Sequence, residues 1–178
     1  MLLLLSVILG AVIGLLMKGS LFRLGGLKGL WFPIAAMAVT PVLGMMPGIG
    51  LAAKAALISI SYGCIVAFSL SNRKYPLPAL LIAVGSLANY TVIAANSFRM
   101  PVSQKALEVY GSISAQAVLE SRADYFIADA GTRLLFLGDV IYIPIPVVGG
   151  FISCGDIVLS LGMMLLMVMV MKGKATEE

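Results

Sequence analysis

Two aspartates, Asp139 and Asp156, each follow a glycine, and a connector rich in apolar residues, glycine and proline joins them. This connector is long and flexible enough to bring the two carboxyl groups to one point. Two carboxyls held within a few ångströms cannot both ionise, so such a pair shares a proton. One carboxylate can then activate water while the other carboxyl protonates a leaving amine. The pair is therefore a candidate aspartic catalytic dyad, which needs neither a metal nor a histidine.

Each aspartate also has a structural interpretation. Asp156 directly precedes an apolar stretch of helical length, where the helix dipole favours an aspartate as N-cap. Asp139 can be a solvated turn residue that pairs with Arg133. The residues alone leave the catalytic and the structural interpretations open.

The composition is that of an integral membrane protein. Hydrophobic residues make up 61% of the chain and charged residues only 11%, with a mean hydropathy of +1.07, whereas soluble domains carry about 25% charged residues. The basic residues lie between apolar stretches rather than among aromatics on a polar face, so we expect no nucleic-acid partner. The chain has no histidine, which excludes Ser-His and Cys-His catalysis, and we expect no metal and no cofactor.

Five apolar stretches predict an all-α polytopic membrane protein with a single integral membrane domain over residues 1–178. The first stretch has no basic region before it and no small-x-small cleavage pattern, so we interpret it as a retained span rather than a signal peptide. The predicted spans cover residues 2–17, 31–46, 55–70, 79–95 and 157–171, with an outer segment at residues 96–156.

The basic loops predict the orientation of these spans. The short loops at residues 18–29 and 72–78 and the C-terminal tail carry lysine and arginine, which marks the cytoplasmic side. Five spans place the two termini on opposite sides. We therefore expect a multi-pass protein of the cell membrane, with its N-terminus outside and its C-terminus in the cytoplasm.

The outer segment has two recognisable parts. Leu107, Tyr110, Ile113 and Ala117 form an apolar stripe at helical spacing, which predicts an amphipathic helix lying in the interface. Residues 140–146 contain two prolines, which predict an extended, strand-like edge over a groove rather than a helix.

Polar side chains near the end of the fourth span form a second candidate group. Asn89 and Asn96 are about two helical turns apart and can face the same groove, and Arg99 follows them. Buried amides within a span commonly hydrogen-bond to a neighbouring helix. Alternatively, the amides bind a substrate backbone or a lipid headgroup, with Arg99 holding an anionic group.

Residues 80–165 resemble a family of small bacterial membrane proteins without an assigned activity. The resemblance rests on an asparagine-containing span, the sequence Arg99-Met100-Pro101-Val102, and the two Gly-Asp motifs before the last span.

A second resemblance is to the lipoprotein signal peptidases, which are aspartic membrane enzymes. Their first catalytic aspartate lies in a Val-Val-Asp-Phe-Ile-like motif, to which Gly138-Asp139-Val140-Ile141 is similar. Their second lies in Phe-Asn-x-Ala-Asp at the start of the last span, with a glycine six residues on. Residues 151–156, with Gly162 after them, resemble that motif, although Ser153 stands in place of its asparagine. The peptidases' Gly-Asn-x-x-Asp-Arg stretch is absent, and five spans are predicted here where that family has four.

The resemblance implies an aspartic membrane endopeptidase that acts on membrane-anchored or lipid-modified peptides at the outer membrane surface. Asp139 and Asp156 would be catalytic, and membrane lipids and a partner membrane subunit would be further partners. The alternative is a non-catalytic membrane subunit that binds a lipid, a small molecule or a partner helix in the same groove. A proton-coupled transporter is a third interpretation. The expected substrate-binding residues are Asn89, Asn96, Arg99, Arg133 and Ser153.

Overall fold

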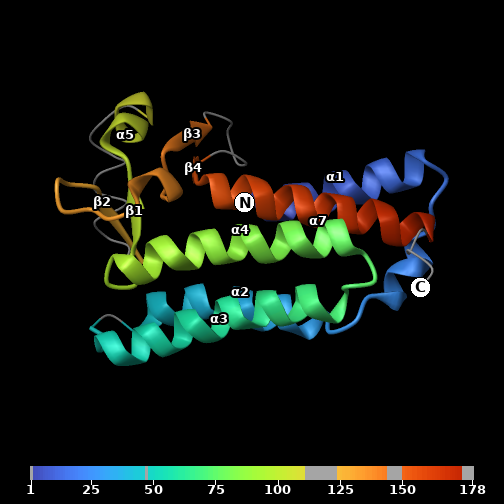
Figure 1. Cartoon of the computed structure of the whole chain (residues 1–178), viewed down its shortest axis with the longest axis horizontal. Coiled ribbons are helices and arrows are strands. Elements are labelled where there is room, and N and C mark those ends of the chain that lie inside the picture. Colours follow the sequence, from blue (N-terminus) through green and yellow to red (C-terminus); the bar gives the residue numbers. More distant parts are fainter. Residues whose placement is uncertain (1, 47, 111–123, 144–149, 174–178) are drawn as a thin grey trace.

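The computed structural model describes residues 2–46, 48–110, 124–143 and 150–173. Five helices form a bundle in which neighbours pack in the order α1, α7, α4, α3 and α2. This row curves, so that α2 and α3 lie beneath the layer of α4, α7 and α1 (Figure 1). The helices are α1 (Leu2–Leu16), α2 (Trp31–Met45), α3 (Leu51–Ser71), α4 (Pro76–Ala95) and α7 (Cys154–Lys172).

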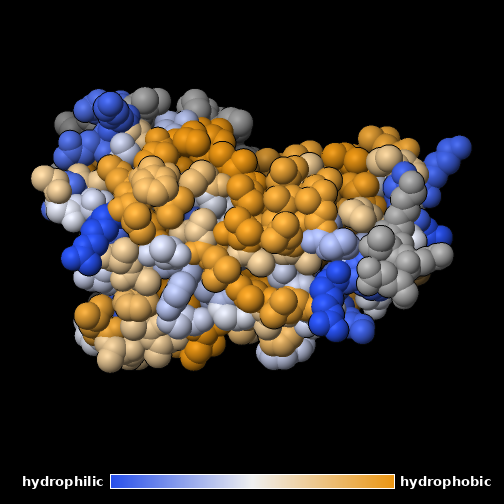
Figure 2. Space-filling view, viewed as in Figure 1, coloured by the Kyte–Doolittle hydropathy of each residue, from blue (hydrophilic) through white to orange (hydrophobic). Residues whose placement is uncertain are grey.

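Three of these helices, α3, α4 and α7, are long and apolar enough to cross a membrane. The helices α1 and α2 are apolar but shorter, with 15 residues each. Large apolar side chains cover the outside of the bundle, and charged residues gather toward its two ends (Figure 2). A lipid environment favours a helical bundle with an apolar outer surface.

The predicted spans correspond to the five helices, but three of the helices begin earlier than predicted. The largest correction is in α3, which begins at Leu51 because Lys54, expected at a boundary, lies inside the helix and is buried. Pro76 and Pro78 occupy the first turn of α4, where no helical N–H donor is needed. The helix α7 begins at Cys154 behind a serine cap.

Glycines allow the close packing of α7 against both neighbours. A Cβ atom at Gly85 of α4 would lie 2.5 Å from the backbone nitrogen of Leu159, and one at Gly10 of α1 would lie 2.7 Å from the carbonyl oxygen of Met164. Such distances leave no room for any side chain. Close backbone approach at small residues is a common way for membrane helices to associate.

The outer segment between α4 and α7 contains short strands, and only one of them lies where the sequence predicts an extended segment. The strands β1 (Met100–Val102) and β2 (Tyr125–Ile127) pair in parallel, with Met100 opposite Tyr125. The strands β3 (Ile141–Ile143) and β4 (Gly150–Ile152) form an antiparallel pair. The remaining elements are α5 (Gln104–Tyr110) and the 3-10 turns η1 (Leu21–Gly26) and η2 (Leu135–Leu137).

Two expectations for the outer segment can be compared with the described residues, and the position of its helix in the membrane interface stays a prediction. Ile141–Ile143 is extended, as the prolines after it predict, while Pro144 and Pro146 lie outside the described residues. A helix is present over Gln104–Tyr110. The rest of the predicted apolar stripe, Ile113 and Ala117, lies outside the described residues.

Candidate functional site

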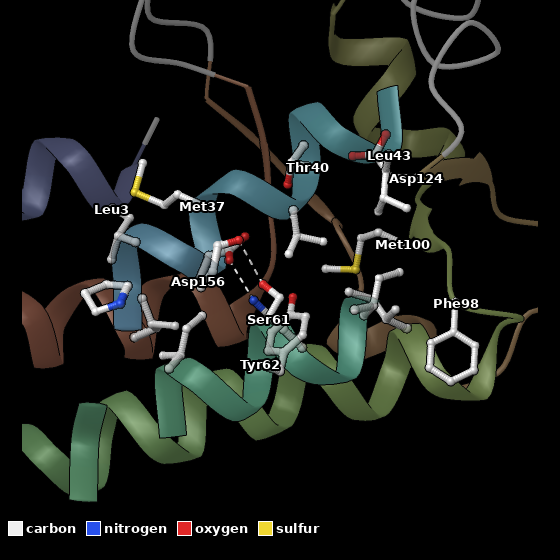
Figure 3. Close-up of a pocket in the computed structure, with 18 of the residues that line it drawn as sticks. Leu3, Met37, Thr40, Leu43, Ser61, Tyr62, Phe98, Met100, Asp124 and Asp156 are labelled. Atoms are coloured by element: carbon white, nitrogen blue, oxygen red, sulfur yellow. Dashed lines mark hydrogen bonds between the residues drawn. The ribbon is translucent and has the colours of Figure 1, made fainter. Parts of the chain in front are cut away.

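Asp139 and Asp156 line the same cavity, which has a volume of about 280 Å³. The cavity lies where α2, α3, α4 and α7 meet the outer segment (Figure 3). Most of its wall is apolar, with Leu43, Met37 and Met100 among the contributing side chains. The polar residues in the wall are Thr40, Ser61, Tyr62, Asn89, Asp124, Tyr125, Asp139 and Asp156.

Asp156 is held by hydrogen bonds to both carboxylate oxygens. The side-chain amide of Asn89 donates to Oδ1 at 2.7 Å, and the backbone N–H of Ser153 donates to Oδ2 at 3.1 Å. The backbone N–H of Asp156 donates to the Ser153 hydroxyl at 2.9 Å, which completes a capping box at the start of α7. The N-cap is therefore Ser153, and the simpler interpretation of Asp156 as the cap is wrong.

Asn89 joins the two ends of this network. Its carbonyl oxygen accepts a hydrogen bond from the Ser153 hydroxyl at 2.7 Å, while its amide group donates to Asp156. Asn89 is 4% exposed, and its side chain reaches Ser153 only because Gly155 has none. A Cβ atom at position 155 would lie 2.1 Å from the Asn89 carbonyl oxygen.

Asp139 lies on the opposite side of β1 from β2 and is held there by its backbone. Its N–H donates to the carbonyl oxygen of Pro101 at 2.9 Å, and its carbonyl oxygen accepts from the N–H of Ser103 at 3.0 Å. Gly138 permits this approach, because a Cβ atom there would lie 2.7 Å from the same Pro101 oxygen. Asp139 is only 2% exposed, so its interpretation as a solvated turn residue is wrong.

Both glycines of the Gly-Asp pairs therefore serve close packing. Gly138 lets the chain lie against β1, and Gly155 lets α7 lie against Asn89. Each glycine places the aspartate after it at the wall of the cavity.

Several residues of the site were not predicted from the sequence. Tyr62 and Ser61 line the cavity from the middle of α3, and Asp124 lines it from just before β2. Lys54 is buried near the start of α3, where the charges of Asp124 and Arg99 act on it. The sequence held one signal for this region, namely a lysine inside an apolar stretch. Because a charge within a span is usually kept only where it has charged or polar partners, Lys54 could have indicated them.

The five expected substrate-binding residues separate into two groups. Asn89 and Ser153 hold Asp156 at the cavity. Asn96, Arg99 and Arg133 line a different pocket, on the outer side of β1 and β2. Within the described ranges, no group of three or more acidic or cysteine side chains is arranged to hold a metal ion.

Replacing Asn89 by Ala should lower the free energy of unfolding by about 1–3 kcal/mol, because Asp156 Oδ1 and the Ser153 hydroxyl each lose a buried partner. Thermal unfolding of the purified protein in detergent measures this loss. Thr91→Ala is the matched control on the same helix, since Thr91 is exposed and bonds only to the Leu87 carbonyl of its own helix. Equal unfolding temperatures for the two variants would contradict the assigned network.

A model of a family of unknown function (DUF5317) matches residues 22–168, which include every residue of the cavity network described above. No curated protein and no solved structure matches the chain.

Proposed function

The chain belongs to the DUF5317 family, whose function is unknown, and from the site itself we propose that it is a membrane-embedded aspartic endopeptidase. The observation that carries the proposal is the position of Asp139 and Asp156 in the wall of one largely apolar cavity. A pair of carboxyls in such a place can supply both a general acid and a general base.

We assign the charge of the pair to Asp156 and the proton to Asp139. Asp156 accepts hydrogen bonds at both oxygens, an arrangement that suits an ionised carboxylate, because it has acceptors only. Asp139 is buried, and a buried carboxyl costs less free energy in its neutral form.

In the proposed reaction, Asp156 accepts a proton from a water molecule whose oxygen bonds to the scissile carbonyl carbon. Asp139 donates its proton to the amide nitrogen as the C–N bond breaks, which leaves a carboxylic acid and an amine. Transfer of a proton from Asp156 to Asp139 then restores the starting state. Tyr62 and Ser61, which also line the cavity, are in a position to orient the substrate.

The proposed substrate is a peptide with an apolar membrane anchor. The cavity wall extends from the two aspartates along α2 and α3 to Pro33, Ile65 and Phe68, which are all apolar. A wall of this kind suits an acyl chain or an apolar helix next to the scissile bond. Membrane lipids and lipidated peptides are therefore the proposed partners, and Asn89 and Ser153 act by positioning Asp156.

The test is cleavage in proteoliposomes that contain the purified protein. The substrate is a mixture of diacylglyceryl-modified peptides with randomised residues at their centre, and mass spectrometry identifies the products. We expect cleavage of the anchored mixture, little cleavage of the same peptides without lipid, and inhibition by an analogue with a hydroxyethylene group in place of the scissile amide. Absence of cleavage from both mixtures would reject the peptidase proposal.

A second candidate is a non-catalytic membrane subunit that binds a lipid, a small molecule or a partner helix in the same cavity. The observation in its favour is that the capping box and Asn89 already use both oxygens of Asp156. These bonds explain the presence of Asp156 by a structural role, with no need for a catalytic one. The two candidates differ in the behaviour of the Asp156 variants considered in the Discussion.

We also propose that all five helices cross the cell membrane, with the N-terminus outside and the C-terminus in the cytoplasm. The order of the helices supports this topology, because α1, α3 and α7 run toward one end of the bundle and α2 and α4 run back (Figure 1). The end where α1, α3 and α7 finish carries six of the ten lysines and arginines in the described part of the chain, and an excess of basic residues marks the cytoplasmic side. They are Lys18, Arg23, Lys28, Arg73, Lys74 and Lys172.

Cysteine labelling tests this orientation in a variant whose Cys64 and Cys154 are replaced by alanine. A membrane-impermeant maleimide added to intact cells should label Ala130→Cys in the outer segment and leave Arg73→Cys unlabelled. Both positions are exposed in the folded protein, so accessibility differs only by the side of the membrane. The reverse labelling pattern would invert the topology and place Asp139 and Asp156 on the cytoplasmic side.

A further inference from the structure

A second pocket opens on the other face of the β1–β2 pair, with a volume of about 420 Å³. Neighbouring residues of the same backbone divide between the two sites. Phe98, Met100 and Tyr125 line the acidic cavity. Arg99 and Phe126 line the second pocket. One layer of backbone therefore separates a site with three carboxylates from a site with two arginines.

Arg99 is held in the wall of the second pocket by the next strand. Its Nε and Nη2 atoms both donate to the carbonyl oxygen of Tyr125, with the Nε bond at 3.0 Å. Its guanidinium group also lies 5.5 Å from the centre of the Phe126 ring. A guanidinium has five N–H donors, so these contacts fix its position and leave donors for a ligand.

Arg133 is placed beside Arg99 by its backbone rather than by its side chain. The Asn96 side chain accepts from the N–H of Arg133 at 3.0 Å and donates to its carbonyl oxygen at 2.8 Å. The Arg133 side chain itself is exposed. The backbone bonds therefore place Arg133 in the wall of the pocket, and its guanidinium group makes no hydrogen bond to another described residue.

The backbone next to both arginines adopts a conformation that side chains disfavour. Ser97 and Phe98 have φ values of 56°, and Leu134 has a φ of 53°. These are left-handed conformations, which cost free energy in residues other than glycine and cluster at binding sites. They flank Arg99 on one side of the pocket and Arg133 on the other.

We propose that this pocket binds a phosphate group. Two arginines and one carboxylate line the pocket, and the Oδ1 of that carboxylate, Asp129, already accepts hydrogen bonds from the N–H of Gly131 at 2.9 Å and the hydroxyl of Thr132 at 3.1 Å. The planar guanidinium fork matches phosphate oxygens in pairs. The phosphate can be a free ion or the headgroup of an outer-leaflet phospholipid. This proposal does not depend on the peptidase proposal, because the two pockets share no lining residue.

The test is isothermal titration calorimetry of the purified protein in a maltoside detergent at constant ionic strength. The two probes are sodium phosphate and dihexanoyl phosphatidic acid. The variants are Arg133→Gln and, as a matched control, Lys105→Gln, which removes one exposed positive charge from α5 of the same outer segment. Elution as a single species from gel filtration checks that each variant is folded.

We expect the parent to bind at least one probe, and Arg133→Gln to weaken that binding by about tenfold or more, as loss of a hydrogen bond to a charged group predicts. Lys105→Gln should bind as the parent does. Binding of the phosphatidic acid alone identifies a lipid site, and binding of both probes identifies a site for the phosphate group itself. The proposal is overturned if neither probe binds the parent, or if the two variants bind equally.

Discussion

Asp139→Asn should lower the rate of cleavage of the anchored peptides by about a thousandfold, within the range that loss of a general acid or base produces. The substituted amide keeps the volume of the carboxyl but cannot donate a proton to the leaving amine. The backbone bonds from residue 139 to Pro101 and Ser103 do not involve the side chain, so the variant should fold. Glu108→Gln is the control, because Glu108 is an exposed acid on α5 of the same segment, and its rate should equal that of the parent.

The substitutions at Asp156 distinguish the two candidate functions. Asp156→Asn keeps an acceptor for the N–H of Ser153 but turns an NH2 donor toward the NH2 group of Asn89, so it should lose about 1 kcal/mol, whereas Asp156→Ala loses the capping bond and the Asn89 contact together. We expect the Ala variant to lose about 1–3 kcal/mol of unfolding free energy. A catalytic carboxylate requires that both variants lose activity. If Asp156→Asn cleaves as fast as the parent, the aspartic mechanism is wrong and the residue is structural.

Gly155→Val should prevent the native packing of α7 against α4. The added Cβ atom would lie 2.1 Å from the Asn89 carbonyl oxygen and 2.9 Å from the carbonyl oxygen of Gly85. Overpacking and the loss of the Asn89 bonds together should lower the free energy of unfolding by about 3 kcal/mol or more. The measurement is the fraction of protein that remains monodisperse after heating in detergent.

The matched control is Gly63→Val on α3. Gly63 is exposed, and a Cβ atom there would have no neighbour within 4 Å. Its unfolding free energy should lie within about 0.5 kcal/mol of the parent value, as for an ordinary surface substitution. Similar losses for the two variants would show that valine in a helix, rather than the crossing of α4 and α7, causes the effect.

Local patterns in the sequence were enough to predict the five helices. Asp139 and Asp156 line one cavity, while their action as a pair stays a prediction. Runs of apolar residues bounded by prolines, glycines and basic residues mark the helices. Such boundaries can be predicted because they depend on residues that are close in the sequence. The helix starts were less predictable. Lys54 reads as a boundary in the sequence, yet it is buried within α3, because its environment comes from the outer segment far along the chain.

The division of the polar residues between two pockets could not be predicted. Asn89 and Asn96 are close on one helix, but Asn96 lies at its end and bonds to the backbone of Arg133 instead of facing the cavity. The turn through Ser97 and Phe98 has a left-handed backbone conformation that serine and phenylalanine do not predict. The pairing of β1 with β2 and with Asp139 joins segments distant in sequence, which no local pattern specifies.

The bond between Asn89 and Asp156 also has a consequence for biosynthesis. The two residues are 67 positions apart, so at about 5–20 residues per second a ribosome makes the amide roughly 3–13 seconds before the carboxylate. During that interval α4 is complete, but the face that carries Gly85 and Asn89 has no α7 against it. An amide without a partner is unfavourable in hydrocarbon. In the proposed membrane topology, the nascent helix would therefore stay at the insertion machinery or in a wet environment until the last helix emerges.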